Sequence, residues 1–313
     1  MAWRVQHAGV MRLLALSLIL AACSDGAGTS LDGPPVGGDG APSADAREGV
    51  DSQPAAGGGC APEVQLGRLS IEPRGLSGSI TDRPQPERFL VHEATVGACS
   101  LWSAGASFCD PACTYPQQCE DSVCVDPPGN LRIGAIIIQG PGGRIDAEPT
   151  SAERPYYSGS SKVPIYGAGD TVHLEAGGDG AITGFGLDLV GHEEVALTTE
   201  PSYELTLTEN VGLTMSWTPS TSPGARVLLH MDSDHHGAPG FIECEADDAD
   251  GTFSVDPALG DRLIEIGASG IGTYVENAYV VRDHRAKVDL AQGCLEVATM
   301  RQDWISVETV LDR

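Results

Sequence analysis

The sequence predicts a mainly β protein: an immunoglobulin-like β-sandwich preceded by a small disulfide-stapled module and a disordered tether. Three features of the 313 residues support this prediction. Apolar and polar residues alternate in short segments of the second half, four cysteines crowd residues 109–124, and glycine, proline and small polar residues fill residues 24–59. Alternation with a period of two is typical of half-buried strands.

Two adjoining segments show the alternation most clearly. Residues 203–208 place a tyrosine and two leucines on one face of a strand, and residues 213–217 do the same with Leu213, Met215 and Trp217. Residues 209–212 between them predict a hairpin turn. Further strands are predicted at residues 132–139, 171–176, 183–190, 225–231, 241–245, 252–255, 273–282, 294–300 and 304–309.

Strands with one apolar face must pack in two layers, which predicts a sandwich over residues 130–313. The Cys…Trp…Cys order of true immunoglobulin domains is absent, because Trp217 precedes both Cys244 and Cys294. The topology therefore stays open. One helix is predicted at residues 257–266, with Asp256 as its cap and a proline at its first position.

The region before the sandwich also contains predicted strands, at residues 63–71 and 89–102. We favour a separate small β and cysteine-rich region over residues 60–126. The alternative is that these strands join the main sandwich, which would make the four-cysteine module an insertion.

The first residues have the pattern of a signal peptide. Arg4 and Arg12 supply a positive start, residues 13–20 are apolar, and Ala21 and Ala22 follow. An apolar run of this length is too short to span a bilayer of about 30 Å. Residues 1–22 are therefore predicted to be removed on export.

The four residues Leu20-Ala21-Ala22-Cys23 resemble the lipobox of bacterial lipoproteins. The resemblance implies cleavage before Cys23, a thioether from its sulfur to diacylglycerol, and an acylated amino terminus such as a palmitate. Two or three acyl chains anchor a protein stably to a lipid bilayer. Ser24, where a retention rule of such lipoproteins would have aspartate, implies the outer membrane. The alternative is a secreted protein with a cysteine at its cleavage site.

Residues 23–59 are predicted to form the lipidated amino terminus and a flexible linker. Leu31, Val36 and Val50 are almost its only large apolar residues. Such a segment buries too little apolar surface to offset its chain entropy. Its root-mean-square reach would be roughly 30–35 Å.

The chain has nine cysteines, and an odd number in an exported protein needs an explanation. Assigning Cys23 to lipid leaves eight. Four of them lie in CDPACTYPQQCEDSVC, where four thiolates also suit Zn²⁺. Disulfides are the favoured interpretation, because the expected compartment is oxidising and zinc sites prefer C-x2-C pairs.

This segment also resembles the CDPxC modules of cysteine-rich bacterial surface lipoproteins. The alternate pairing Cys109–Cys119 and Cys113–Cys124 is favoured, although four cysteines allow three connectivities. The remaining cysteines suggest the pairs Cys60–Cys99 and Cys244–Cys294.

The segment HMDSDHHGAPG is the best candidate for chemistry. If the strand from residue 225 continues, His230, Asp232, Asp234 and His236 point to one face, and such residues are ligands for Zn²⁺ or another transition metal. Residues 237–240 form a predicted turn, which argues that the strand has already ended.

The segment ADDADG is a second candidate, for Ca²⁺. It offers Asp247, Asp248, Asp250 and Gly251, but it lacks the spacing and the distal glutamate of a calcium loop. A turn between the strand around Cys244 and residues 252–255 is the favoured interpretation.

The motifs of common enzyme classes are not found in the sequence. The net charge of −26 disfavours nucleic acid as a partner. Tyr156, Tyr157 and Trp304 would suit stacking on sugars, although core packing is the favoured role for Trp304. We therefore expect a membrane-anchored surface lipoprotein with a structural, adhesive or ligand-binding role toward a protein or glycan. The alternative is a metal-dependent hydrolase of surface glycans or peptides that uses the segment from His230 to His236.

Overall fold

The fold is known from a computed structural model, which describes most of the chain after residue 58. The described residues are 59–84, 90–104, 109–120, 122–150, 156–180, 182–199, 203–233, 240–268, 275 and 277–311. The predicted signal peptide, Cys23 and most of the predicted linker lie outside these residues. The described part is mainly β, as the alternation predicts, and its single α-helix, α1, spans Pro257–Ala268.

A nine-stranded sheet forms the centre of the body. Its strand order is β3-β4-β15-β14-β17-β18-β1-β2-β9. Its strands are β3 (Leu90–Val96), β4 (Cys99–Ala104), β15 (Gly240–Asp247), β14 (Arg226–Asp232), β17 (Asn277–Leu290), β18 (Gly293–Trp304), β1 (Gln65–Glu72), β2 (Gly75–Ile80) and β9 (Tyr156–Ser160). The sheet has two faces, and its apolar residues point to the one that we call the inner face.

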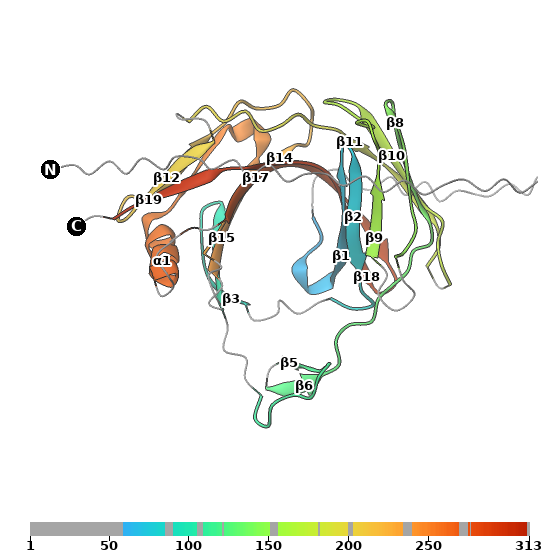
Figure 1. Ribbon diagram of the computed structural model, residues 1–313, viewed down its shortest axis with the longest axis horizontal. Helices are drawn as coiled ribbons and strands as arrows, with labels where there is room; N and C mark the ends of the chain where they lie inside the picture. Colours follow the sequence, from blue (N-terminus) through green and yellow to red (C-terminus); the bar gives the residue numbers. More distant parts are fainter. Residues whose placement is uncertain are drawn as a thin grey trace, which may run out of the picture. The chain divides into compact units, whose positions relative to one another are not determined.

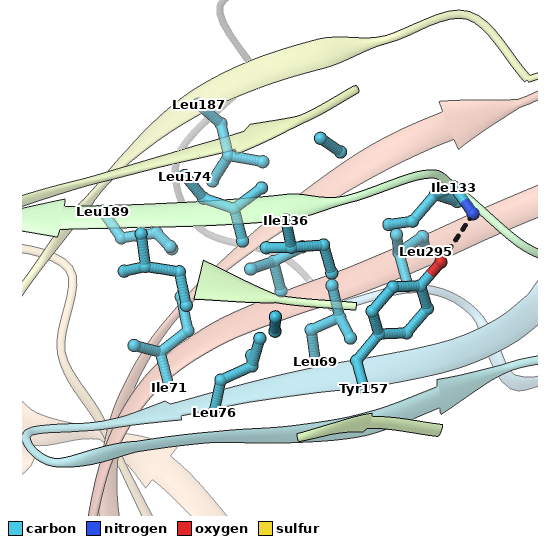
Figure 2. Packing of buried hydrophobic residues seen from close by; sticks show 14 of the residues in the cluster. Leu69, Ile71, Leu76, Ile133, Ile136, Tyr157, Leu174, Leu187, Leu189 and Leu295 are labelled. Atoms are coloured by element: carbon cyan, nitrogen blue, oxygen red, sulfur yellow. Dashed lines mark hydrogen bonds between the residues drawn. The ribbon is translucent and has the colours of Figure 1, made fainter. Parts of the chain in front are cut away.

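A four-stranded sheet packs against one half of the inner face. Its order is β11-β10-β7-β8, with β11 at Phe185–Val190, β10 at Thr171–Ala176, β7 at Ile136–Gly140 and β8 at Gly143–Ala147. Figure 1 shows β10 and β11 close to β1, β2 and β18 of the large sheet. Leu69 and Leu295 of the large sheet meet Ile136 and Leu174 of the small one in the first hydrophobic core (Figure 2). The result is a two-layered packing, so the predicted sandwich is confirmed in this broad sense.

The other half of the inner face is covered by short strand pairs and the helix. β12 (Glu204–Thr208) pairs in parallel with β19 (Ser306–Val310), and β13 (Leu213–Ser216) pairs with β16 (Thr252–Val255). Residues such as Leu207, Met215 and Leu263 pack there against Leu229 in the second hydrophobic core. The two cores share one sheet, and each has its own cover.

The predicted strands at residues 203–217 exist, but their pairing as a hairpin is wrong. A turn joins them, with Asn210 in the left-handed conformation at φ 63°. Beyond an isolated bridge between Thr208 and Gly212 the strands part, because β12 and β13 find partners in β19 and β16. Burial under the central sheet therefore decides the pairing.

The separate small β region predicted for residues 60–126 is also wrong, and the alternative is correct. β1 pairs in parallel with β18, and β4 pairs with β15, so both belong to the central sheet. The four-cysteine module follows β4 as an insertion, with a short hairpin of β5 (Gln118–Glu120) and β6 (Val123–Val125). Leu69 and Ile71 of β1 are fully buried in the first core, so this strand belongs to the main body.

Within the module, the predicted alternate pairing is confirmed. Disulfides join Cys109 to Cys119 and Cys113 to Cys124. A segment this short has almost no apolar core, so its two covalent links supply most of its order.

The two pairs predicted for the remaining cysteines are wrong. Cys60 bonds to Cys294, and Cys99 bonds to Cys244. Cys99 and Cys244 are direct cross-strand neighbours of β4 and β15, and Cys60 lies just before β1, whose partner β18 carries Cys294. The strand order of the sheet thus brings together cysteines that are far apart in the sequence.

Candidate functional site

The predicted site begins on the outer face of the large sheet. In β14, Val227, Leu229 and Met231 are buried in the second core, so His230 and Asp232 point to the opposite face. The structure brings these two predicted residues together, with 3.8 Å between His230 Nε2 and Asp232 Oδ2. Asp234 and His236 lie outside the described residues.

A carboxylate that the sequence analysis missed completes the surroundings of His230. Glu243 on β15 places Oε1 3.1 Å from Nδ1 of the imidazole. Burial lowers the pKa of His230, but the carboxylates of Asp232 and Glu243 outweigh it and raise the pKa to about 9. The ring is therefore a cation at neutral pH.

This geometry bears on the predicted metal site. A protonated imidazole has no lone pair for a metal, and the two carboxylates engage opposite nitrogens. A single ion at either nitrogen would contact only one of them. The metal site of His230, Asp232, Asp234 and His236 stays a prediction, because half of it lies outside the described residues.

His230 is also enclosed by aromatic rings. The Tyr279 ring stacks on it at a centroid distance of 4.7 Å and 11°, and the Phe241 ring lies on its other side at 5.0 Å and 30°. An imidazolium between two π faces gains a cation–π attraction in addition to its ion pairs.

These rings belong to a longer line across six neighbouring strands. We call this line the aromatic row, and it comprises His92, Trp102, Phe241, His230, Tyr279 and Trp304. Successive centroids are 4.8, 6.3, 5.0, 4.7 and 5.6 Å apart, close to the spacing of strands. The central rings therefore cover one another's faces.

Trp304 at the end of the row is different. Tyr279 meets it edge-on at 76°, and 65% of the Trp304 residue is exposed. The T-shaped contact and the high exposure leave much of the indole surface accessible to solvent. The core-packing role favoured for Trp304 is therefore wrong.

The other predicted stacking residues do not form an exposed platform. Tyr157 is fully buried in the first core, where its hydroxyl accepts a hydrogen bond from the backbone N–H of Ile133 at 2.8 Å (Figure 2). The side chain of Tyr156 lies outside the described residues. Trp304 is thus the one predicted stacking residue that the described structure exposes.

A network of ion pairs lies on the same outer face. Arg68 contacts Asp283 and Glu296 at 2.9 and 3.3 Å, and Arg285 contacts Asp283 and Glu245 at 2.7 and 3.0 Å. Asp283 and Glu296 are buried. Glu296 on β18 is matched by Arg68 of the adjacent strand β1, and Asp283 on β17 is matched by Arg285 of the same strand and by Arg68. This network explains why the charged second half of β17 forms a strand.

The second predicted site, ADDADG, is the turn that we favoured. Residues Asp248–Asp250 form a short 3-10 helix that ends at Gly251 with φ 66°, and β16 follows. Asp248 is buried, and its Oδ1 accepts a hydrogen bond from Arg282 Nε at 3.0 Å. Its role in the described structure is structural, as the buried partner of an arginine.

The four-cysteine module contains the only group of three close ligand atoms found among the described residues. It consists of Cys109, Cys113 and Cys124, and all three are in disulfides. Sulfur in a disulfide is not a thiolate ligand. The module also exposes Tyr115 almost completely.

Within the part of the chain that the structure describes, no helix has the length and apolar character needed to cross a bilayer. No family model matches the sequence, and no curated protein matches it.

Two solved structures show a limited similarity. A 1.5-MDa bacterial ice-binding adhesin is 11% identical, with 80% of this chain and 67% of that chain covered and a TM-score of 0.19. A Ca²⁺-stabilized adhesin with which an Antarctic bacterium binds ice is 10% identical, with 75% and 57% covered and a TM-score of 0.16. At such TM-scores the backbones do not superpose as one fold, so neither similarity bears on the function.

Proposed function

We propose that this chain is an exported lipoprotein of the cell envelope that is anchored through acyl chains on Cys23 and carries a ligand-binding β body. The cysteine pairing is the observation that supports it. Four disulfides use eight of the nine cysteines, which leaves Cys23 of the expected lipobox. Disulfides persist outside the cytoplasm, and lipidation needs a free thiol.

The proposed binding surface is the outer face at the Trp304 end of the aromatic row. An exposed indole suits the C–H face of a sugar ring, and the stacked rings behind it hold the indole in place. The net charge of −26 disfavours polyanions. A neutral glycan is therefore the ligand class that this surface fits best, and Ser24 supports a location at the outer membrane.

The anchor is tested by metabolic labelling with a palmitate analogue and mass spectrometry of the mature amino terminus. The unaltered chain should carry the label and partition into detergent. Cys23→Ser should lose both properties, while Ser30→Ala in the same predicted linker should keep them. Label that survives in Cys23→Ser, or an unmodified Cys23 in the mature chain, would contradict the anchor.

The binding role is tested with soluble β-glucan, mannan and dextran by affinity electrophoresis. Trp304→Ala should weaken binding about two- to tenfold, since an aromatic stacking contact contributes about 0.5–1.5 kcal/mol. Tyr115→Ala, which removes an exposed aromatic residue from the cysteine module, is the matched control. Binding that is equally reduced in both variants, or no binding to any of the three polymers, would contradict the proposed surface.

A further inference from the structure

A polar belt separates the two hydrophobic cores on the inner face of β17 and β18. Val280 belongs to the second core, whereas Ala286 and Val297 belong to the first. The belt between them consists of Arg282, His284, Thr299 and Arg301.

The chain crosses this belt between β11 and β12. Thr299 Oγ1 donates to the carbonyl of Val190 at 2.6 Å, and Arg282 Nη1 donates to that of Glu194 at 2.8 Å. Arg301 Nε lies 3.4 Å from the carbonyl of His192. We call the belt together with residues 191–195 the seam.

The arginine at the centre of the seam is fully matched. Arg282 is buried, and it contacts Asp248 Oδ1 at 3.0 and 2.9 Å through Nε and Nη2. Nη2 also donates to the carbonyl of Thr218 at 2.7 Å. A buried guanidinium requires such partners, so Arg282 has a structural explanation.

Two histidines of the seam have no such explanation. His192 is 1% exposed and His284 is 7% exposed, with their ring centroids 6.0 Å apart. Both nitrogens of His192 and Nδ1 of His284 are buried and form no hydrogen bond with the described part of the chain. Each unsatisfied nitrogen costs about 1–3 kcal/mol, so a partner outside the chain is expected.

The rings are in the protonation state that metals require. Burial, followed by the neighbouring His284, lowers the pKa of His192 to about 4, and burial also lowers the pKa of His284. Both imidazoles are neutral at physiological pH, and each offers one lone pair. Their surroundings differ from those of His230, whose nitrogens face carboxylates.

A pocket lies next to the backbone that covers His284. It has a volume of about 480 Å³, and Ser220, Gly224 and Asp248 are among its lining residues. A Cβ atom at Gly224 would lie 3.2 Å from His284 Cδ2 and 3.4 Å from His284 Nε2. The His284 ring therefore lies directly behind the backbone that forms the pocket wall.

Carboxylates around the seam supply negative charge. Glu193 Oε2 is buried without a hydrogen bond within the described residues, whereas Oε1 lies 3.8 Å from Arg282 Nη1. Asp248, Glu193 and Glu194 outnumber the two arginines of the seam, so the local charge tolerates a cation.

We propose that His192 and His284 bind one divalent transition-metal ion, Zn²⁺ in the first place. Two imidazole nitrogens are typical ligands of Zn²⁺, Cu²⁺ and Ni²⁺, whereas Ca²⁺ and Mg²⁺ prefer oxygen. Water molecules supply the remaining ligands. The ion links the segment that crosses between the cores to β17. This site is independent of the lipid anchor and of the sugar-binding surface.

The test uses the full chain without a histidine tag, first treated with EDTA. One equivalent of CoCl2 should give a visible absorption band that ZnCl2 abolishes, and ZnCl2 should raise Tm by several degrees. His192→Gln and His284→Gln should each weaken binding at least tenfold. His173→Gln, which alters an exposed histidine paired with Asp188, should bind as the unaltered chain does.

A second measurement guards against variants that do not fold. In the unaltered chain, Co²⁺ should broaden the backbone amide resonances next to residues 192 and 284 before those next to residues 92, 173 and 230. Broadening elsewhere first, no binding by the unaltered chain, or undiminished binding by both folded seam variants would each overturn the proposal.

Discussion

His230 and His192 lie on opposite sides of the same sheet, and burial affects them in opposite ways. Both are largely withdrawn from solvent, which by itself lowers the pKa of a histidine. Around His230 two carboxylates more than compensate, whereas around His192 nothing in the described structure does. The comparison shows that the neighbouring strands, rather than the depth of burial, decide which buried histidine is charged.

The two faces of the sheet also differ in which elements supply the partners of their charged side chains. The outer face receives charged side chains from adjacent strands at fixed register, as when Glu243 lies opposite His230. The seam receives its partners from loops such as residues 191–195 and the turn at Asp248. Charged residues on the outer face therefore find partners on strands of the same sheet. Charged residues in the seam find partners on the loops that cover the inner face.

The largest expected effect comes from removing the charge that matches the seam arginine. Asp248→Ala leaves the Arg282 guanidinium buried without its carboxylate, and we expect a loss of about 3–5 kcal/mol in the free energy of unfolding. Urea unfolding under non-reducing conditions measures it. Asp250→Ala, an exposed residue of the same turn, is the control and should change little. Equal losses in both variants would show that the turn, and not the ion pair, is responsible.

The next effect is the acid sensitivity of the seam. The pKa of His192 is about 4 in the folded protein and near the ordinary 6.5 when unfolded, so the unfolded chain takes up the proton first. Stability is therefore retained above pH 6.5 and lost as the pH falls toward 4, by about 3 kcal/mol at most. Unfolding free energies between pH 4 and 7 should fall less steeply in His192→Gln. Identical slopes for the two proteins would contradict the neutral assignment.

A smaller effect of opposite sign is expected from His230. Its pKa rises from the ordinary 6.5 to about 9 on folding, so the stabilisation is complete below pH 6.5 and is lost as the pH rises through 9. We expect about 2 kcal/mol, since the side chain keeps some exposure to solvent. His230→Gln should flatten this alkaline arm and leave the acid arm in place. The reverse pattern would exchange the roles of the two histidines.

The smallest effect concerns the rings around His230. Tyr279→Leu removes one stacked face and should lower the unfolding free energy by about 1 kcal/mol below pH 6. At pH 10 His230 is neutral and makes no cation–π contact, so the substitution should lower the unfolding free energy by less. NMR titration of the imidazole supplies an independent check, because the pKa of His230 should fall in this variant. A loss that is the same at both pH values would indicate ordinary packing alone.

Local patterns in the sequence predicted much of the secondary structure. β10 matches its predicted bounds because Val172, Leu174 and Ala176 alternate with polar residues. The helix matches within two residues because Asp256 and Pro257 mark its start. In both cases the signal lies within the element itself.

Features that depend on distant strands could not be predicted in this way. The strand predicted at residues 273–282 stops before Asp283 and Arg285, whose partners Arg68 and Glu245 are more than 35 residues away in the sequence. The sequence also cannot show that Phe241 and Tyr279 flank His230, since the register of three strands decides it. No local pattern in the sequence marks His192. It is buried because residues 191–195 cross the inner face of β17 and β18, which the sequence does not show.

The order in which the cysteines are synthesised has a consequence for how this protein matures. Cys60 and Cys99 are made first, and their partners follow 234 and 145 residues later. An oxidant that joins cysteines as they appear would link Cys60 to Cys99 and trap the chain before β15 and β18 exist. Efficient production therefore calls for either delayed oxidation or an isomerase that exchanges the early bond.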